Sequence, residues 1–580
     1  MKFDDTLTKI GGFGRYQKLL LLGFIIFYPG SSYQFTNINF LVGGMDHWCR
    51  FDFHSDFNKT YLKELIIPKA INEFGEELYS KCEMYDVNIT ELSDDPVGDL
   101  GKLIPDSNWT RVPCNGWEFD RTEFYSTIVS QHRLVCDRSW LQTIPAIAYV
   151  MGSFCGSILA GYFSDRWGRK RTAVLMIMGQ MLCNIAEAFS PYFWLFVGLR
   201  FLVGIWNMGA HTALLILVIE NMLPVYRNHC TYFFTLGQIL EFILPITAYF
   251  VRNHVHLQII GVGVAVPGLI YAILLPESPR WLLSRKRYKE YDAVLRTIAK
   301  INDVAFTEEM TKGTSELDLE GKDNGVTDEL KERASFLNLL RTPRLRQRTL
   351  IVCFLWFSRG FVLYAFGTNI GKLVPGNIYL NMVLITAGSE VPTFLTIWFA
   401  LFRSGRRVAM MIYILITGLC CLLMIPLIMV KMKLLVTIAA MIALAALKTL
   451  ERVLVLYTGE IYPTPARTIG FGSAASAARI AALIATQLPL LKLIWFGLPY
   501  VFLSIFPIAS SVLAYFLPET KGSHLPETFE EAEMFGTRLH GEFEKKRVNT
   551  NDSKGHSDPS ITDARSEKSN SDKQIYMIDG

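Results

Sequence analysis

Charged residues are scarce in this chain. Asp, Glu, Lys and Arg make up 19% of its 580 residues, against about 25% in soluble proteins. Hydrophobic residues make up 51%, and the mean hydropathy is +0.27. The charges gather in residues 46–139, 276–348 and 518–580. The long apolar runs between them exclude an ordinary soluble fold, and the net charge of +4 does not indicate nucleic acid because the basic residues mark loops.

Motifs of familiar enzyme classes are also missing. The sequence has neither a G-x-x-x-x-G-K phosphate loop nor an H-E-x-x-H zinc motif. We therefore predict that the chain is not an enzyme, and we expect no cofactor and no metal. An A-x-A-like cleavage site is absent after the first apolar run, so residues 19–28 are interpreted as part of a membrane span rather than a signal peptide.

Apolar runs recur at the length of about 20 residues that crosses about 30 Å of hydrocarbon. We predict an all-α membrane protein with twelve transmembrane helices in two six-helix halves. The predicted windows are residues 18–40, 141–162, 172–190, 193–216, 231–251, 257–275, 349–367, 379–402, 408–430, 434–457, 470–491 and 495–517. The predicted divisions are a cytoplasmic N-terminus (1–17), an N-terminal half (18–275), a cytoplasmic central loop (276–348), a C-terminal half (349–517) and a cytoplasmic disordered tail (518–580).

The basic residues predict how the chain lies in the membrane, because Lys and Arg concentrate in cytoplasmic loops. The loops after the second and eighth windows and the 276–348 segment are basic. Both termini are then cytoplasmic, and the chain is expected in the plasma membrane. The first loop, 41–139, falls outside.

The first loop carries features of an extracellular segment. Three N-x-[ST] sequons predict glycosylation at Asn58, Asn88 and Asn108. An even number of cysteines in an oxidising compartment predicts two disulfides and leaves three pairings open. The cysteines are Cys49, Cys82, Cys114 and Cys136.

The two halves repeat one another at a nearly constant offset. The Gly168-Arg-Lys turn recurs at Gly405 and the Pro276-Glu-Ser turn recurs at Pro518, offsets of 237 and 242 positions. Such a duplication is typical of secondary transporters, in which a site between the halves is exposed to each side in turn. We expect charges at the cytoplasmic helix ends to hold the inner gate shut. The candidates are Asp165, Arg166, Arg169, Glu220, Arg227, Glu460 and Arg467.

Several motifs in order resemble the organic cation/anion/carnitine transporter family (solute carrier family 22) of the major facilitator superfamily. They are Gly161–Arg171, Pro113–Asp120, Pro276–Trp281, Tyr457–Thr464 with Arg467, and Pro518–Gly522. The resemblance covers about residues 9–535. It implies the major facilitator fold, a small organic ion as substrate, and alternating access across a lipid bilayer. Departures include Gln131-His132, Phe402 and Ala443-Leu444, where the family usually has other residues.

The resemblance also implies which spans line the substrate site. The span-eleven position that is acidic in cation carriers, and Arg in anion and carnitine carriers, is Arg479 here. An arginine can hold a carboxylate bidentately, and aromatic rings can stack on ammonium groups. Both signs of charge favour a zwitterion or a carboxylate-bearing solute, with an organic cation as the alternative. The candidate residues are Arg479, Arg359, Trp356, Tyr364, His211, Gln238, Glu390, Glu451 and Arg452.

Buried charges often serve one another, which is the competing interpretation. Lys448 has the spacing to pair with Glu451, while Arg359 has two candidate partners in Glu241 and Glu390. The sequence leaves open a coupling ion, Na⁺ or H⁺, and self-association through the cysteine-rich loop. A non-transporting receptor or scaffold is the rival from another class.

Overall fold

The computed structural model describes residues 3–50, 63, 66–71, 77–86, 110–223, 226, 233, 236–306, 336–463, 466–521, 526 and 529–535. Several predicted features lie outside these residues. They are the three sequons at Asn58, Asn88 and Asn108, the gate candidate Arg227, and the tail beyond residue 535. Their predictions stay untested.

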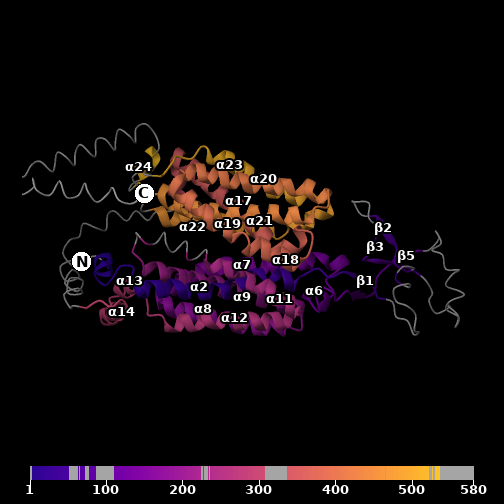
Figure 1. The fold of residues 1–580 in the computed structure, drawn as a ribbon, viewed down its shortest axis with the longest axis horizontal. Coiled ribbons are helices and arrows are strands. Elements are labelled where there is room, and N and C mark those ends of the chain that lie inside the picture. Colours follow the sequence, from indigo (N-terminus) through magenta and orange to yellow (C-terminus); the bar gives the residue numbers. More distant parts are fainter. Residues whose placement is uncertain are drawn as a thin grey trace, which may run out of the picture.

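The N-terminal half is a bundle of long helices in which α7 and α8 both pack on α9, and α12 packs on α2 and α8 (Figure 1). Its elements are α1 (Phe3–Lys9), α2 (Arg15–Thr36), α3 (Ile38–Leu41), η2 (Cys136–Thr143), α7 (Ile144–Trp167), α8 (Arg169–Ala188), α9 (Phe193–Glu220), η4 (Leu240–Phe242), α11 (Ile243–Val251) and α12 (His254–Leu274). Two short helices follow it, α13 (Pro279–Ser284) and α14 (Tyr288–Ile301).

The C-terminal half is a second bundle, in which α17 packs on α22, and α20 packs on α21 and α23. Its elements are α16 (Phe336–Arg341), α17 (Pro343–Leu373), α18 (Ile378–Met382), η5 (Val383–Ala387), α19 (Glu390–Trp398), η6 (Phe399–Arg403), α20 (Arg406–Met429), α21 (Lys433–Ile461), α22 (Arg467–Ala485), η8 (Leu488–Leu493), α23 (Leu498–Ala514) and α24 (Phe529–Met534). The predicted eighth window is one nearly continuous helical run that includes two π-helical stretches, η5 and η6.

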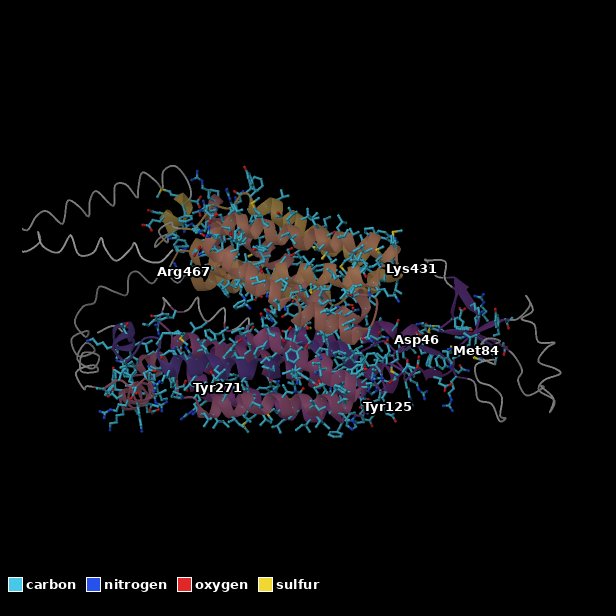
Figure 2. All side chains as sticks on the ribbon, viewed as in Figure 1. Asp46, Met84, Tyr125, Tyr271, Lys431 and Arg467 are labelled. Carbon is cyan, nitrogen blue, oxygen red and sulfur yellow. A yellow bond between two sulfur atoms is a disulfide. The ribbon has the colours of Figure 1, made fainter. Side chains whose placement is uncertain are left out.

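The segment between α3 and α7 projects from one end of the bundles (Figure 1). It holds three antiparallel two-stranded pairs, β1 with β6, β2 with β3, and β4 with β5. The elements are β1 (His47–Cys49), β2 (Lys69–Ile71), β3 (Glu77–Tyr79), β4 (Glu83–Tyr85), β5 (Arg111–Pro113), β6 (Trp117–Phe119) and the helix α6 (Ile128–Gln131). We call this end of the molecule the loop end and the opposite end the motif end. Lys431 and Arg467 lie at the loop end and the motif end of the C-terminal half (Figure 2).

All twelve predicted windows fall on helical segments. Among the described residues, nine helices are long and apolar enough to cross a membrane. The fifth and twelfth windows fall on the shorter apolar helices Leu236–Val251 and Leu498–Ala514. The third falls on α8, whose polar residues Gln180, Asn184 and Glu187 are buried by neighbouring helices. The predicted helical membrane fold is confirmed.

Close approach of the backbones shapes the N-terminal bundle. A Cβ atom at Gly152 of α7 or Gly204 of α9 would come within 2.0 or 2.3 Å of a carbonyl oxygen of the facing helix. Small residues at such contacts are how membrane helices pack when lipid offers no hydrophobic driving force between them.

Candidate gates and substrate site

At the motif end, the turn between α7 and α8 carries a cluster that we call the N-terminal latch (Asp165, Arg169, Glu220, Glu277 and Ser278). Arg169 lies 2.5 Å from Asp165 and 3.0 Å from Glu220. The Glu277 carboxylate accepts hydrogen bonds from the backbone N–H groups of Arg169 and Lys170, at 2.8 and 3.1 Å. A carboxylate there satisfies orphan donors and complements the helix dipole at the start of α8.

The turn between η6 and α20 carries an equivalent set, the C-terminal latch (Arg406, Glu460, Glu519 and Thr520). The Glu519 carboxylate accepts from the backbone N–H groups of Arg406 and Arg407, at 2.6 and 3.1 Å. The Thr520 hydroxyl donates to Glu460 at 2.6 Å, as the Ser278 hydroxyl donates to Glu220 in the first half. The carboxylate cap and the bond from a hydroxyl to a glutamate therefore recur in both halves.

The latches are unequal in charge. Arg406 lies 3.8 Å from Glu460, whereas Arg169 lies 3.0 Å from Glu220 and also pairs with Asp165. No carboxylate in the C-terminal half takes the place of Asp165, because that stretch reads Phe402-Arg403-Ser404.

Two gate candidates lie apart from these clusters. Arg166 donates to the Tyr162 hydroxyl at 3.1 Å and does not join the Asp165–Arg169 pair. Arg467 makes no ion pair with Glu460, which contacts Arg406 instead. Glu460 and Arg467 are seven residues apart in the sequence, but Arg467 begins α22 and forms no ion pair with Glu460.

At the loop end the two halves are joined by hydrogen bonds that we call the seam. Asn39 donates to the Gly367 carbonyl at 2.7 Å and accepts from the Ile370 N–H at 3.0 Å. Three further bonds join Lys372 to Gln142, Thr143 to Gln487, and Tyr379 to the Glu123 carbonyl. In the described residues, the hydrogen bonds between halves lie at this end or in mid-bundle, and the halves meet there in the view of Figure 1.

Midway between the ends, predicted substrate residues gather from both halves into what we call the mid-bundle cluster. Arg359 of α17 forms an ion pair of 2.5 Å with Glu451 of α21, and its guanidinium lies over the Trp356 ring. Lys448 of α21 forms a buried ion pair with Glu390 of α19.

The internal pairs differ from those that sequence spacing suggested. Lys448 pairs with Glu390 rather than with Glu451, and Arg359 pairs with Glu451 rather than with Glu241 or Glu390. The reason is helix rotation. Glu451 lies three residues after Lys448, but its side chain is aimed at α17, while Lys448 is aimed at α19.

Two arginines of this cluster reach across to the other half. Arg452 donates to Gln238 at 2.8 Å, and Gln238 in turn donates to the Tyr28 hydroxyl of α2. Arg479 of α22 donates to the Tyr364 hydroxyl at 2.8 Å and approaches the Met208 sulfur at 3.5 Å. Arg479 forms no ion pair with a carboxylate among the described residues.

His211 of α9 lies against aromatic rings, with centroid distances of 5.9 Å to Phe24 and 6.3 Å to Tyr28. Arg479 and Glu451 are near enough to act on it electrostatically. Tyr28 and Met208 belong to the cluster but were missed by sequence reasoning. An aromatic and a thioether inside apolar spans carry no distinguishing signal.

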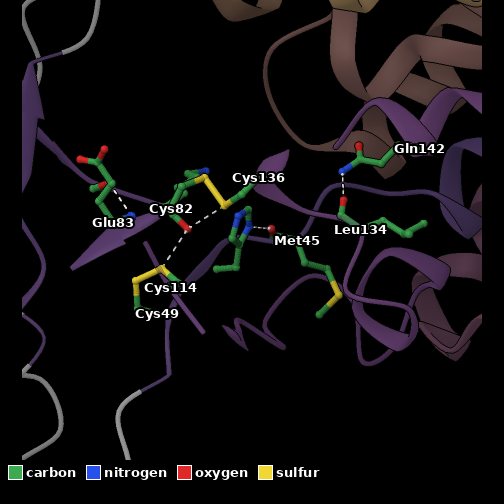
Figure 3. Close-up of a disulfide and its surroundings, with 11 residues drawn as sticks. Met45, Cys49, Cys82, Glu83, Cys114, Leu134, Cys136 and Gln142 are labelled. Atoms are coloured by element: carbon green, nitrogen blue, oxygen red, sulfur yellow. Dashed lines mark hydrogen bonds between the residues drawn. A yellow bond between two sulfur atoms is a disulfide. The ribbon is translucent and has the colours of Figure 1, made fainter. Parts of the chain in front are cut away.

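The segment that projects at the loop end is cross-linked. Its disulfides are Cys49–Cys114 and Cys82–Cys136, which confirms the prediction of two bridges and selects one of the three pairings (Figure 3). A cavity of about 490 Å³ lies at its base, away from the mid-bundle cluster, and includes Asp46, Lys81 and Gln142 in its wall. The hydrogen bond from Lys81 lowers the pKa of the Asp46 carboxyl below its usual range.

Comparison with known proteins decides the family. The family described as "Sugar (and other) transporter" matches residues 113–532. Solute carrier family 22 member 3 of Rattus norvegicus is 31% identical over 577 residues, which cover 94% of this chain and 99% of that protein. The chain belongs to solute carrier family 22.

Other relatives of this transporter family come from Drosophila melanogaster. A carcinine transporter is 29% identical, with 92% of this chain and 79% of the relative covered. A beta-alanine transporter is 27% identical, with 92% and 89% covered. Among solved structures, the inward-open xylose transporter XylE of E. coli has a TM-score of 0.57 at 15% identity and covers 88% of this chain and 98% of its own. The major facilitator fold is thereby confirmed.

Proposed function

We propose that this transporter carries small organic ions that bear both a carboxylate and an ammonium group. The observation that carries the proposal is Arg479, which reaches the boundary between the halves without a carboxylate partner in the described chain. A guanidinium so placed offers a fork of donors to a substrate carboxylate. The Tyr364 hydroxyl accepts a hydrogen bond from the Arg479 guanidinium and holds it in place from one side.

The negative counterpart is Glu241 of η4. It makes no ion pair within the described residues, although the Tyr28 hydroxyl lies within hydrogen-bond reach and Lys448 and Glu390 are near enough to act on it electrostatically. The other acids of the cluster, Glu451 and Glu390, are already neutralised by internal partners. Arg479 and Glu241 therefore remain available for a substrate of mixed charge, while Arg452, which also has no acidic ion-pair partner among the described residues, is held by Gln238. A relative named as a transporter of beta-alanine, an amino acid with both groups, supports this substrate class.

The orientation that we propose places the loop end outside the cell and the motif end in the cytoplasm. Basic residues at the motif-end turns support it, as do disulfides in the loop. The expected location is the plasma membrane, with both termini cytoplasmic. In this orientation the seam seals the outside, and transport requires the seam to part and the latches to rearrange.

The test of the substrate class is uptake by cells that express Arg479→Ala, measured by mass spectrometry with zwitterions, organic anions and organic cations in parallel. We expect uptake of carboxylate-bearing substrates to fall by about tenfold or more, the loss of a charge-assisted contact of about 1.5–3 kcal/mol. Surface expression should not change. Tyr364→Phe is the matched control, since it removes the hydroxyl that holds Arg479 and should reduce uptake less.

If Arg479→Ala takes up zwitterions at the rate of the unsubstituted protein, the proposal is contradicted. An organic cation is the second candidate, favoured by the relatives named as organic cation transporters and by Glu241. Uptake of cations alone, lost in Glu241→Gln and kept in Arg479→Ala, would select it. If the chain reaches the cell surface and no substrate of the panel enters, the receptor hypothesis replaces both.

A further inference from the structure

A buried carboxyl group and a buried guanidinium group lie near each other in the N-terminal half, apart from the mid-bundle cluster. Glu187 of α8 and Arg200 of α9 both have side chains that are 0% exposed. The Arg200 Nη1 to Glu187 Oε1 distance is 3.7 Å, too long for a hydrogen bond. Neither Glu187 oxygen has a hydrogen-bond donor among the described residues. A carboxylate that is buried without donors is costly in its charged form.

Few other titratable groups lie around this pair. Cys183 is one turn earlier on α8, and α7 contributes Tyr149, whose ring lies 4.8 Å from the Arg200 guanidinium. On α12, the His254 ring contacts the Ser126 hydroxyl at 3.2 Å. Gln258 of the same helix carries no charge. The α2 residues that contact Arg200 are also uncharged. Arg200 is therefore the charged group that faces Glu187 in the described structure.

Arg200 donates its hydrogen bonds to the end of α2 rather than to Glu187. Its Nη2 donates to the Gln34 carbonyl at 2.7 Å and to Asn37 Oδ1 at 2.5 Å. Two residues after Asn37, Asn39 makes the two hydrogen bonds of the seam to α17. The arginine thus supports the end of α2, directly before α3, whose Asn39 makes these seam bonds.

The geometry matches a neutral Glu187. With Glu187 protonated, Arg200 has no negative partner and keeps its donors on α2, as observed. With Glu187 ionised, attraction in a medium of low dielectric would draw the guanidinium across the 3.7 Å gap and away from Asn37. Protonation would then favour the sealed loop end, and loss of the proton would favour its opening.

We propose that Glu187 is a proton-binding site whose occupancy is linked, through Arg200 and the end of α2, to closure of the seam. Glu187 is the second-last residue of α8, at the loop end of the N-terminal half. The inference rests on the transport cycle of the proposed function. It does not depend on which substrate is carried.

The test measures the distance between the halves as a function of pH in the full-length chain. Spin labels are placed at Arg138→Cys and Leu493→Cys, two exposed loop-end positions on opposite halves, after replacement of the cysteines outside the two disulfides. We expect the ratio of short to long distances to rise about fivefold or more from about pH 8 to about pH 5.5. Because the readout is a distance, its failure is distinct from failure of the substrate proposal.

Glu187→Gln, which keeps the shape and cannot ionise, should show the short distance at every pH. Asp46→Asn is the matched control: it removes a loop-end carboxylate outside the pair, and the pH dependence should persist. If the distance ratio of the unsubstituted protein does not change with pH, the proposal is overturned. It is also overturned if the ratio of Glu187→Gln changes with pH as that of the unsubstituted protein does. As a second measurement, infrared difference spectra of the parent should show a protonated carboxylic acid band that Glu187→Asp shifts, and absence of that band would also overturn it.

Discussion

Lys448 and Glu390 lie in the C-terminal half with side chains 8% and 0% exposed, which makes their ion pair sensitive to loss of either partner. We expect Glu390→Gln to destabilise the protein by about 3–5 kcal/mol, because it leaves the Lys448 ammonium buried and unpaired. The measurement is the midpoint of thermal unfolding of detergent-purified protein. Arg15→Gln, which removes one partner of the exposed Arg15–Asp303 pair, is the comparison variant and should cost far less.

The double variant Glu390→Gln with Lys448→Met distinguishes pairing from packing. It removes both charges, so it should recover most of the stability that Glu390→Gln loses. If the double variant is as unstable as the single one, the pair is held for packing reasons and the expectation is wrong.

These partners could not be assigned from sequence. Spacing ranks neighbours on one helix, whereas the rotation of α19 and α21 decides which side chains meet.

The turns that begin α8 and α20 differ in backbone conformation although their carboxylate caps are the same. Gly168 has φ +107° and ψ 158°, whereas Gly405 has φ −68° and ψ 152°. A Cβ atom would meet a cap carboxylate at 2.3 Å in one turn and 2.4 Å in the other. Gly168→Ala should therefore cost about 1–3 kcal/mol more than Gly405→Ala, because only the first combines the clash with a backbone region that is nearly exclusive to glycine.

Thermal unfolding of the two variants side by side provides the measurement, and equal losses would show that the clash alone decides.

Elements were the most predictable level of this molecule. Hydropathy is a local property, so every predicted window found a helix, even α8 with its buried Gln180 and Asn184. The motif repeat also predicted where the latches lie. It could not predict that Arg406 rather than Arg467 would meet Glu460, since that contact depends on how the turn folds.

For the molecule as a whole, the transport cycle that we propose requires the seam to break. A cleavable thiol-reactive cross-linker that joins Gln142→Cys to Lys372→Cys, whose parent side-chain ends are 3.1 Å apart, should reduce uptake by at least tenfold. Reduction should restore it. The matched control is a cross-link within the loop, between Glu83→Cys and Arg111→Cys, which lie on one strand pair and should leave uptake unchanged. Full uptake by the cross-linked seam variant would show that the halves do not separate there.

The two disulfides have a consequence for proteolysis, because they interlace along the chain. Cys49 pairs with Cys114, which lies after Cys82 in the chain, and Cys82 pairs with Cys136, which lies after Cys114. A single cut anywhere from residue 50 to 135 therefore leaves the fragments joined by at least one bridge, and a cut between Cys82 and Cys114 leaves them joined by two. Such a nicked protein migrates as one band until it is reduced. A cut in the central loop gives two pieces that neither of these bridges connects, so a gel run with and without reductant reveals which loop a protease reached.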